Sequence, residues 1–308
     1  MDPVLRAALT SWDPRAEVII VLALAGIIYF RGYLHLRKRT ATNRQHSRWQ
    51  ASARWRPISY LGGLLILAIA LMSPIDVLAT QLFTMHMIQH VLLVMIAPPL
   101  LLIANPLPFS LWGLPDRLRP EASRLLSRKA IFRSRLKQIT GAGIVWMVFV
   151  IIYWGWHDPR AYTLALQNGF VHDLEHISFF VVSLLFWWHA IGAGPRIHRS
   201  FAPGVRIAYL LSAIPVNMIA GVAIAFATSP IYPFYEALPR LWGLSVMEDQ
   251  RFAGVIMWVP GSMMYIIAAL ILAARWLGKE EKKPALPEKA WAGDNAMAAP
   301  GWNQNNTS

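Results

Sequence analysis

Long apolar stretches alternate with short polar segments along most of the chain. Seven of the stretches are long enough to cross a bilayer, because about 20 apolar residues span its hydrocarbon core. We therefore expect an all-α protein, a bundle of seven transmembrane helices within residues 1–277, followed by a disordered cytoplasmic tail at 278–308. The predicted helices lie near residues 17–35, 57–73, 82–104, 139–157, 169–191, 204–227 and 251–275.

The basic residues alternate between the two sides of this predicted bundle. Of the 29 Lys and Arg residues, 24 fall on the side that carries the C-terminal tail and the loops after the first, third and fifth stretches. Basic loops stay cytoplasmic, so the pattern predicts an N-terminus outside and a C-terminus inside. The net charge of +13 then reflects topology and contact with anionic lipid, and we expect no nucleic-acid binding.

Composition narrows the chemistry that the bundle can perform. Hydrophobic residues make up 56% of the chain and charged residues 15%, which leaves no soluble domain of any size to carry the function. The chain has no cysteine, which excludes disulfides, CxxC redox chemistry and thiolate metal sites. A metal ion would need His, Met, Asp or Glu ligands.

Histidines occur where a membrane helix should be apolar. His86 and His90 lie at the outer start of the third stretch, and His172 and His176 at the outer start of the fifth. Residues four apart share one face of a helix. With His157 at the outer end of the fourth stretch, five of the nine histidines lie near the outer face. Polar groups at this depth are costly, so they favour a functional interpretation.

Two histidine pairs on facing helices can supply four imidazoles to one site. Neutral imidazole is a good ligand for copper, zinc and haem iron. A single histidine near a helix end is more often an interfacial hydrogen-bonding residue, but two pairs at the same depth favour a shared site. Met85 and Met87 flank His86 and point to different faces, so at most one of these thioethers can join it.

Several short motifs contain or follow these histidines. In chain order they are Met85-His86-Met87-x-Gln89-His90, Pro98-Pro99-Leu100-Leu101, Trp156-His157-x-Pro159-x-x-Tyr162, His172-x-x-x-His176 with Phe186-Trp187, Pro230-x-Tyr232-x-x-Tyr235, and Asp249-Gln250-x-x-Ala253-Gly254-x-x-Met257-Trp258. Together they resemble the CtaG-like assembly factors of caa3-type cytochrome c oxidase. The resemblance covers residues 57–275, most of the chain.

This resemblance implies a multi-pass protein of the bacterial inner (cytoplasmic) membrane that is not an enzyme. Such a factor helps to mature a haem–copper oxidase and acts on the copper of its catalytic subunit. The expected partners are that subunit, the lipid bilayer and a periplasmic or extracellular copper donor.

The residues and the resemblance together predict a copper site near the outer face, from which copper passes laterally to the oxidase. The expected metal ligands are His86, His90, His172, His176, His157 and Asp249, with Asp76, Met85, Gln89, Gln250 and Trp258 in supporting positions.

Three other interpretations stay open on the sequence alone. One histidine from each pair can clamp a haem b, which would make the protein an electron carrier. A zinc-dependent intramembrane hydrolase can use Asp249 or Glu175 as its base. An assembly chaperone without metal would use the histidines only for packing or partner contacts. An absorption spectrum and metal analysis distinguish these cases.

Overall fold

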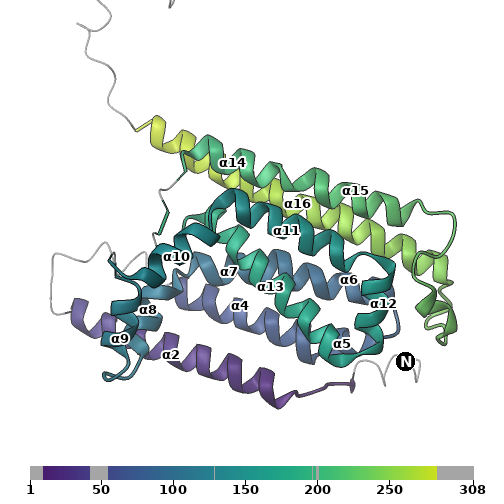
Figure 1. The fold of residues 1–308 in the computed structure, drawn as a ribbon, viewed down its shortest axis with the longest axis horizontal. Helices are drawn as coiled ribbons and strands as arrows, with labels where there is room; N and C mark the ends of the chain where they lie inside the picture. The colour runs from purple at the N-terminus through teal and green to yellow at the C-terminus, as the bar shows by residue number, and fades with distance from the viewer. Residues whose placement is uncertain (1–9, 42–54, 128, 196, 199–200, 283–308) are drawn as a thin grey trace, which may run out of the picture.

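The computed structural model describes residues 10–41, 55–127, 129–195, 197–198 and 201–282, and over these residues the chain is helical without strands (Figure 1). The first half contains α2 (Ala16–Ala41), α4 (Trp55–Met72), α5 (Pro74–Ala79), α6 (Phe83–Val91), a π-helical turn (Leu92–Ile96), α7 (Ala97–Ile103), α8 (Pro106–Gly113) and α9 (Arg119–Leu125). The second half contains α10 (Ile131–Ile139), α11 (Ala142–Trp156), α12 (Pro159–Gln167), α13 (Gly169–Ile191), α14 (Pro203–Leu211), α15 (Ala213–Ala225), a 3₁₀ turn (Pro233–Ala237) and α16 (Val246–Glu280).

The prediction of an all-α membrane protein is confirmed. Among the described residues, six helical segments are each long and apolar enough to cross a membrane, and the number reaches seven if the bent pair α10–α11 forms one span. The two members of that pair meet at 57°. With 15 residues, α11 is only about 22 Å long, which explains why it falls short of a full span by itself.

The last helix begins earlier than the apolar pattern predicted. A capping box formed by Ser245 and Glu248 starts α16 at Val246 rather than at 251, so Asp249 and Gln250 lie on the helix and not in the loop before it. The helix continues to Glu280, beyond the predicted boundary at 277. Residues 42–54 of the predicted basic loop, and the predicted disordered tail from residue 283 onward, lie outside the described residues.

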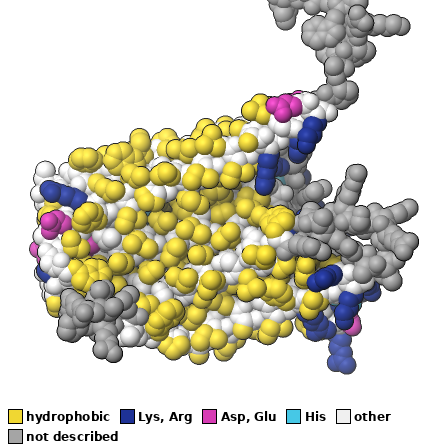
Figure 2. Space-filling view, turned by 180° about the vertical axis from the view of Figure 1, so that it is seen from behind, with side chains coloured by type: hydrophobic (Ala, Val, Ile, Leu, Met, Phe, Trp, Pro, Cys, Tyr) yellow, Lys and Arg dark blue, Asp and Glu magenta, His cyan; other side chains and the backbone are white. Residues whose placement is uncertain are grey.

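The long helices run along one common axis (Figure 1). In this view α2 lies along one flank and α14, α15 and α16 along the other, with α4, α6, α7, α11 and α13 between them. The short helices α8, α9 and α10 gather at one end, and α5 and α12 at the opposite end, where α6 and α13 begin. Apolar side chains cover the flank seen in Figure 2, and most of the Lys and Arg side chains in that view lie at the end that carries α8–α10.

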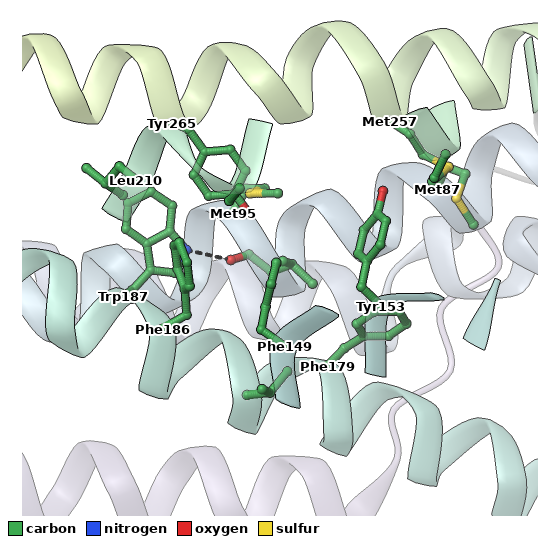
Figure 3. Packing of buried hydrophobic residues seen from close by; sticks show 14 of the residues in the cluster. Met87, Met95, Phe149, Tyr153, Phe179, Phe186, Trp187, Leu210, Met257 and Tyr265 are labelled. Atoms are coloured by element: carbon green, nitrogen blue, oxygen red, sulfur yellow. Dashed lines mark hydrogen bonds between the residues drawn. The ribbon is translucent and has the colours of Figure 1, made fainter. Parts of the chain in front are cut away.

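Pro98 and Pro99 leave a carbonyl of the π-helical turn without a backbone donor. The carbonyl of Val94 would normally accept a hydrogen bond from residue 98 in an α-helix or residue 99 in a π-helix, and both are prolines without an N–H. The indole of Trp187 on α13 donates to this carbonyl instead, at 2.9 Å (Figure 3). The bond ties α13 to the broken helix inside the apolar core.

Small residues bring α15 and α16 into close contact. A Cβ atom on Gly254 would lie 2.5 Å from the backbone nitrogen of Ala225 and 2.7 Å from the carbonyl oxygen of Gly221. No side chain fits there, so the two helices approach at backbone distance, as small residues commonly allow between membrane helices. This contact fixes the position of α16, whose first turns reach the histidine end of the bundle.

Candidate metal centre

The four paired histidines come together between α6 and α13. The ring of His86 has its centroid 4.4 Å from that of His90, 5.4 Å from that of His172 and 6.0 Å from that of His176. The rings of His90 and His176 are 5.5 Å apart. His86 is fully buried, His90 and His176 are buried, and His172 is half-buried. The i, i+4 spacing on two packed helices therefore produces a single cluster of imidazoles.

Glu175 places a carboxylate in the same cluster. Its side chain is fully buried, with one oxygen 3.8 Å from His86 Nε2 and the other 3.6 Å from His90 Nε2. Two groups of described side chains have ligand atoms close enough to share a metal ion, each group within 4.8 Å: His86 with His172 and His176, and His86 with His90 and Glu175. His86 belongs to both groups.

Most polar atoms of this cluster have no hydrogen-bond partner. The unpartnered buried atoms are His86 Nε2, both ring nitrogens of His90, both ring nitrogens of His176 and both oxygens of Glu175. Buried polar groups in proteins are nearly always satisfied, so a concentration of exceptions at one point needs an explanation such as an ion. In contrast, the distant His189 bonds its Nε2 to the Thr140 carbonyl at 2.8 Å.

Two of the predicted residues lie beside the cluster rather than inside it. His157 bonds through Nδ1 to the carbonyl oxygen of Tyr153 at 2.6 Å, and its buried Nε2 has no partner. His157 and His90 line a cavity of about 30 Å³, which is room for about one water molecule. Met85, the predicted supporting thioether, is half-buried on α6.

Asp249, expected among the ligands, lies at the start of α6. Its two carboxylate oxygens accept hydrogen bonds from the backbone N–H groups of Phe83 and Thr84, both at 2.9 Å. The first residues of a helix have free N–H groups, and the residue before α6, Leu82, provides no side-chain cap. Asp249 thus caps α6 from another helix, and it belongs to neither group of possible ligands.

Asp76 and Gln89 connect the corner between α4 and α6. The amide nitrogen of Gln89 donates to the Ala70 carbonyl at 2.8 Å and to Asp76 Oδ1 at 2.6 Å. Burial raises the pKa of Asp76 to about 6, and the hydrogen bond from Gln89 opposes that shift. These contacts hold the third span against the second, next to His90.

The other two supporting residues lie near the α15–α16 contact. Gln250 accepts a hydrogen bond from the Ile231 backbone at 2.7 Å, which anchors the loop after α15. The backbone and Cβ of Trp258 lie against Gly221. These contacts suit packing around the site.

A buried tyrosine chain leads away from His86. The Nδ1 atom of His86 is hydrogen bonded to the Tyr162 hydroxyl, which lies 2.8 Å from the Tyr235 hydroxyl. The Tyr235 hydroxyl donates to the Ala79 carbonyl at 3.3 Å. Burial raises the pKa of both tyrosines well above the usual phenol value, so both remain protonated.

An ion pair and a cavity lie beside the cluster. At the end of α13, Arg15 binds both carboxylate oxygens of Asp173 at 2.8 Å, beside the half-buried His172. Arg15 and Asp173 also border a largely apolar cavity of about 310 Å³ between α2, α4 and α13, and His176 lines the same cavity. The ion pair thus lies at the edge of an apolar cavity that reaches the cluster.

A comparison with known protein families shows the family of the chain. The sequence model of the cytochrome c oxidase caa3 assembly factors (Caa3_CtaG) matches residues 27–279. The chain belongs to this family. The match includes both histidine pairs, Glu175 and Asp249.

The chain also has curated relatives in mycobacteria. It is 26% identical over 285 residues to uncharacterized protein Mb0105 of Mycobacterium bovis. The aligned region covers 91% of this chain and 41% of that protein. Uncharacterized protein ML1998 of Mycobacterium leprae is 26% identical over 282 residues, covering 89% and 40%. The chain thus spans about two fifths of the length of these relatives. No solved structure matches it significantly.

Glu175 belongs to one of the two possible ligand groups but was missing from the ligands predicted from the sequence. A signal for it exists, because residue 175 is three positions after His172 and so shares its helix face. Asp173 and Glu175 both follow the start of a helix, where acidic residues are common for electrostatic reasons. Only the packing of α13 against α6 distinguishes the two: Asp173 pairs with Arg15, and Glu175 faces the imidazoles.

Proposed function

We propose that this caa3 assembly factor binds copper at the cluster of His86, His90, His172, His176 and Glu175, and delivers it to the catalytic subunit of cytochrome c oxidase. Family membership supports the role in oxidase assembly. The geometry of the cluster supports the role of a metal ion in that process.

The separations around Glu175 carry the proposal. Hydrogen bonds between nitrogen and oxygen have lengths of about 2.7–3.2 Å. The carboxylate oxygens lie at 3.6 and 3.8 Å from the two Nε2 atoms, too far for that bond, and have no other partner. Two ligand atoms about 2.0–2.2 Å from one shared ion lie roughly 3.3–3.6 Å apart at the tetrahedral angle, and farther apart at wider angles. The observed distances suit an ion between these groups.

The ligand atoms limit which metal ion suits the site. Imidazole nitrogen suits copper and zinc, and the chain has no thiolate to hold either more tightly. A copper ion is the cargo that a factor serving a haem–copper oxidase would carry. Glu175 lies between His86 and His90, where a macrocycle would have to insert, so a single ion fits this gap better than haem.

The surroundings of the cluster support passage from an outer donor to a membrane partner. The Lys and Arg residues of α9 and α10 lie at the end opposite to the one where α6 and α13 begin (Figure 1), and basic ends face the cytoplasm, which supports a position of the cluster near the outer face. Copper enters past His172 and the Arg15–Asp173 pair. It leaves by ligand exchange at His176, which lines the cavity on the flank of the bundle that Arg15 and Asp173 also border.

Metal analysis of the detergent-purified protein tests the proposal. We expect about one copper per chain after loading, lost when His86, His90, His172 and His176 are all changed to alanine. The matched control changes His189 and His198 to alanine. Each of these two histidines is hydrogen bonded to Thr140, away from the cluster. The control should keep its copper.

Three results would contradict the proposal. Copper retained by the quadruple variant would exclude the histidine cluster as the site. Zinc in place of copper, with hydrolysis of lipid amides, would favour an intramembrane hydrolase. Absence of any metal from the loaded parent protein would favour an assembly chaperone that works without one.

A test in cells uses a host that lacks its own copy of this protein. There the quadruple variant should leave the oxidase without its full copper content.

A further inference from the structure

The tyrosine chain beside the cluster has a fixed direction. A backbone carbonyl can only accept a hydrogen bond, and a phenol has a single proton to donate. Tyr235 donates that proton to the carbonyl of Ala79. The Tyr162 hydroxyl must therefore donate to the Tyr235 oxygen, 2.8 Å away. The remaining partner of the Tyr162 oxygen is His86 Nδ1, which must be the donor in their hydrogen bond.

We infer that Tyr162 and Tyr235 are positioning residues for the metal site: they hold the proton of His86 on Nδ1 and leave Nε2 free to bind the ion. This inference rests on the proposed function. Nε2 is the ring nitrogen that lies 3.8 Å from the Glu175 carboxylate and has no hydrogen-bond partner. His86 is also the ligand that the two groups of candidate donors share, so its tautomer affects both.

The surroundings of the chain suit a positioning role. Tyr162 and Tyr235 are each about 1% exposed, so water does not compete for their hydroxyls. The Tyr162 ring packs against Phe83 at 5.4 Å and Tyr232 at 4.4 Å between ring centroids. Phe83 also contacts the Tyr235 ring at 5.8 Å. These contacts fix both hydroxyls and the direction from which His86 is held.

The location of the two tyrosines explains why short elements outside the spans matter to the site. Tyr162 lies on α12 and Tyr235 on the 3₁₀ turn after α15, and Ala79 ends α5. The chain of bonds ties all three elements to one ring nitrogen on α6. Partners in this position behind a metal-binding histidine orient its ring and raise its basicity, and their loss commonly weakens metal binding about 10–100-fold.

Two substitutions test this inference in the full chain. Tyr162→Phe removes the acceptor for the Nδ1 proton and should weaken copper binding about 10–100-fold. Tyr235→Phe frees the Tyr162 proton to turn toward Nδ1, and should weaken binding less. Because the two residues act in series, the double variant should bind no more weakly than Tyr162→Phe alone. The control is Tyr60→Phe, a buried tyrosine in another part of the core that donates to the Ala25 carbonyl at 3.4 Å.

Nitrogen NMR of ring-labelled histidine gives the readout that a general loss of packing would not move. In metal-free protein, the His86 signal, assigned by its loss in His86→Ala, should report a proton on Nδ1. Tyr162→Phe and Tyr235→Phe should shift it toward the Nε2-protonated form, and Tyr60→Phe should not. Thermal unfolding of each variant checks that the fold is kept.

The outcomes separate this inference from the proposed function. An Nε2 proton on His86 in the parent protein would overturn the inference, and so would unchanged copper affinity and tautomer in Tyr162→Phe. If the parent protein binds no copper while the two tyrosines still determine the tautomer of His86, the proposed function fails and the role of the tyrosines stands. If copper binds through the histidines and its affinity does not change in either tyrosine variant, the proposed function stands and the role of the tyrosines fails.

Discussion

Changing Glu175 to glutamine is the sharpest test of the ligand set. The substitution keeps the shape of the side chain, removes its charge and replaces one carboxylate oxygen by an NH2 group. The carboxylate is fully buried, so solvent and salt screen it little, and its oxygens lie 3.6 and 3.8 Å from two ring nitrogens. A cation between these atoms would lie closer to the carboxylate than 4 Å. Opposite unit charges at about 4 Å and an effective dielectric constant of about 20 interact by about 4 kcal/mol.

This energy converts into a measurable loss of affinity. Each 1.4 kcal/mol is about a factor of ten, so Glu175→Gln should weaken copper binding roughly 100- to 1,000-fold. With copper at about 100 times the parent dissociation constant, binding should stabilise the parent by about 2.7 kcal/mol. At the same concentration the variant should gain less than about 0.5 kcal/mol, because about half or more of its sites stay free.

The assay combines competition titration of copper with unfolding of the purified protein, with and without the metal. Glu248→Gln is the matched control, because Glu248 is an exposed residue in the capping box of α16 and glutamine serves in that motif as well. It should bind copper as the parent protein does. An affinity of Glu175→Gln within about threefold of the parent value would refute the claim that this carboxylate is a ligand.

Three further substitutions test how the fold supports the site. Asp249→Ala leaves two N–H groups at the start of α6 without their acceptor, which should cost about 2–4 kcal/mol in unfolding assays; Asp249→Asn keeps an acceptor and should cost less, and equal losses would contradict the capping role. Asp76 has a raised pKa of about 6, so its contribution to stability is present at low pH and is lost as pH rises through 6; Asp76→Asn should therefore raise the thermal midpoint relative to the parent at pH 8 but not at pH 4, and a pH-independent difference would argue against a buried carboxyl. Trp187→Phe leaves the Val94 carbonyl unsatisfied in the core and should lower stability by at least about 1–3 kcal/mol, whereas Trp146→Phe, which loses only an exposed bond to Ser212, should cost less.

The sequence by itself determined the helical class, the approximate spans and the pairing of the histidines. The length of an apolar segment indicates a bilayer crossing, because lipid offers the backbone no hydrogen bonds and a helix satisfies its own. This rule does not depend on the neighbours of a helix. The i, i+4 spacing of His86 with His90, and of His172 with His176, likewise fixes a shared face from local geometry alone. The two pairs indeed meet in one cluster.

Only the tertiary structure decided which acidic residue joins that cluster. Asp249 and Glu175 both lie in the first turns of a helix, where local physics favours acidic residues for capping or for the helix dipole. Packing directs Asp249 to the free N–H groups of α6 and buries Glu175 among the imidazoles. It also aligns Tyr162, Tyr235 and Ala79 from three separate elements behind His86. Such contacts depend on how elements distant in sequence cross in space, and no local pattern encodes that crossing.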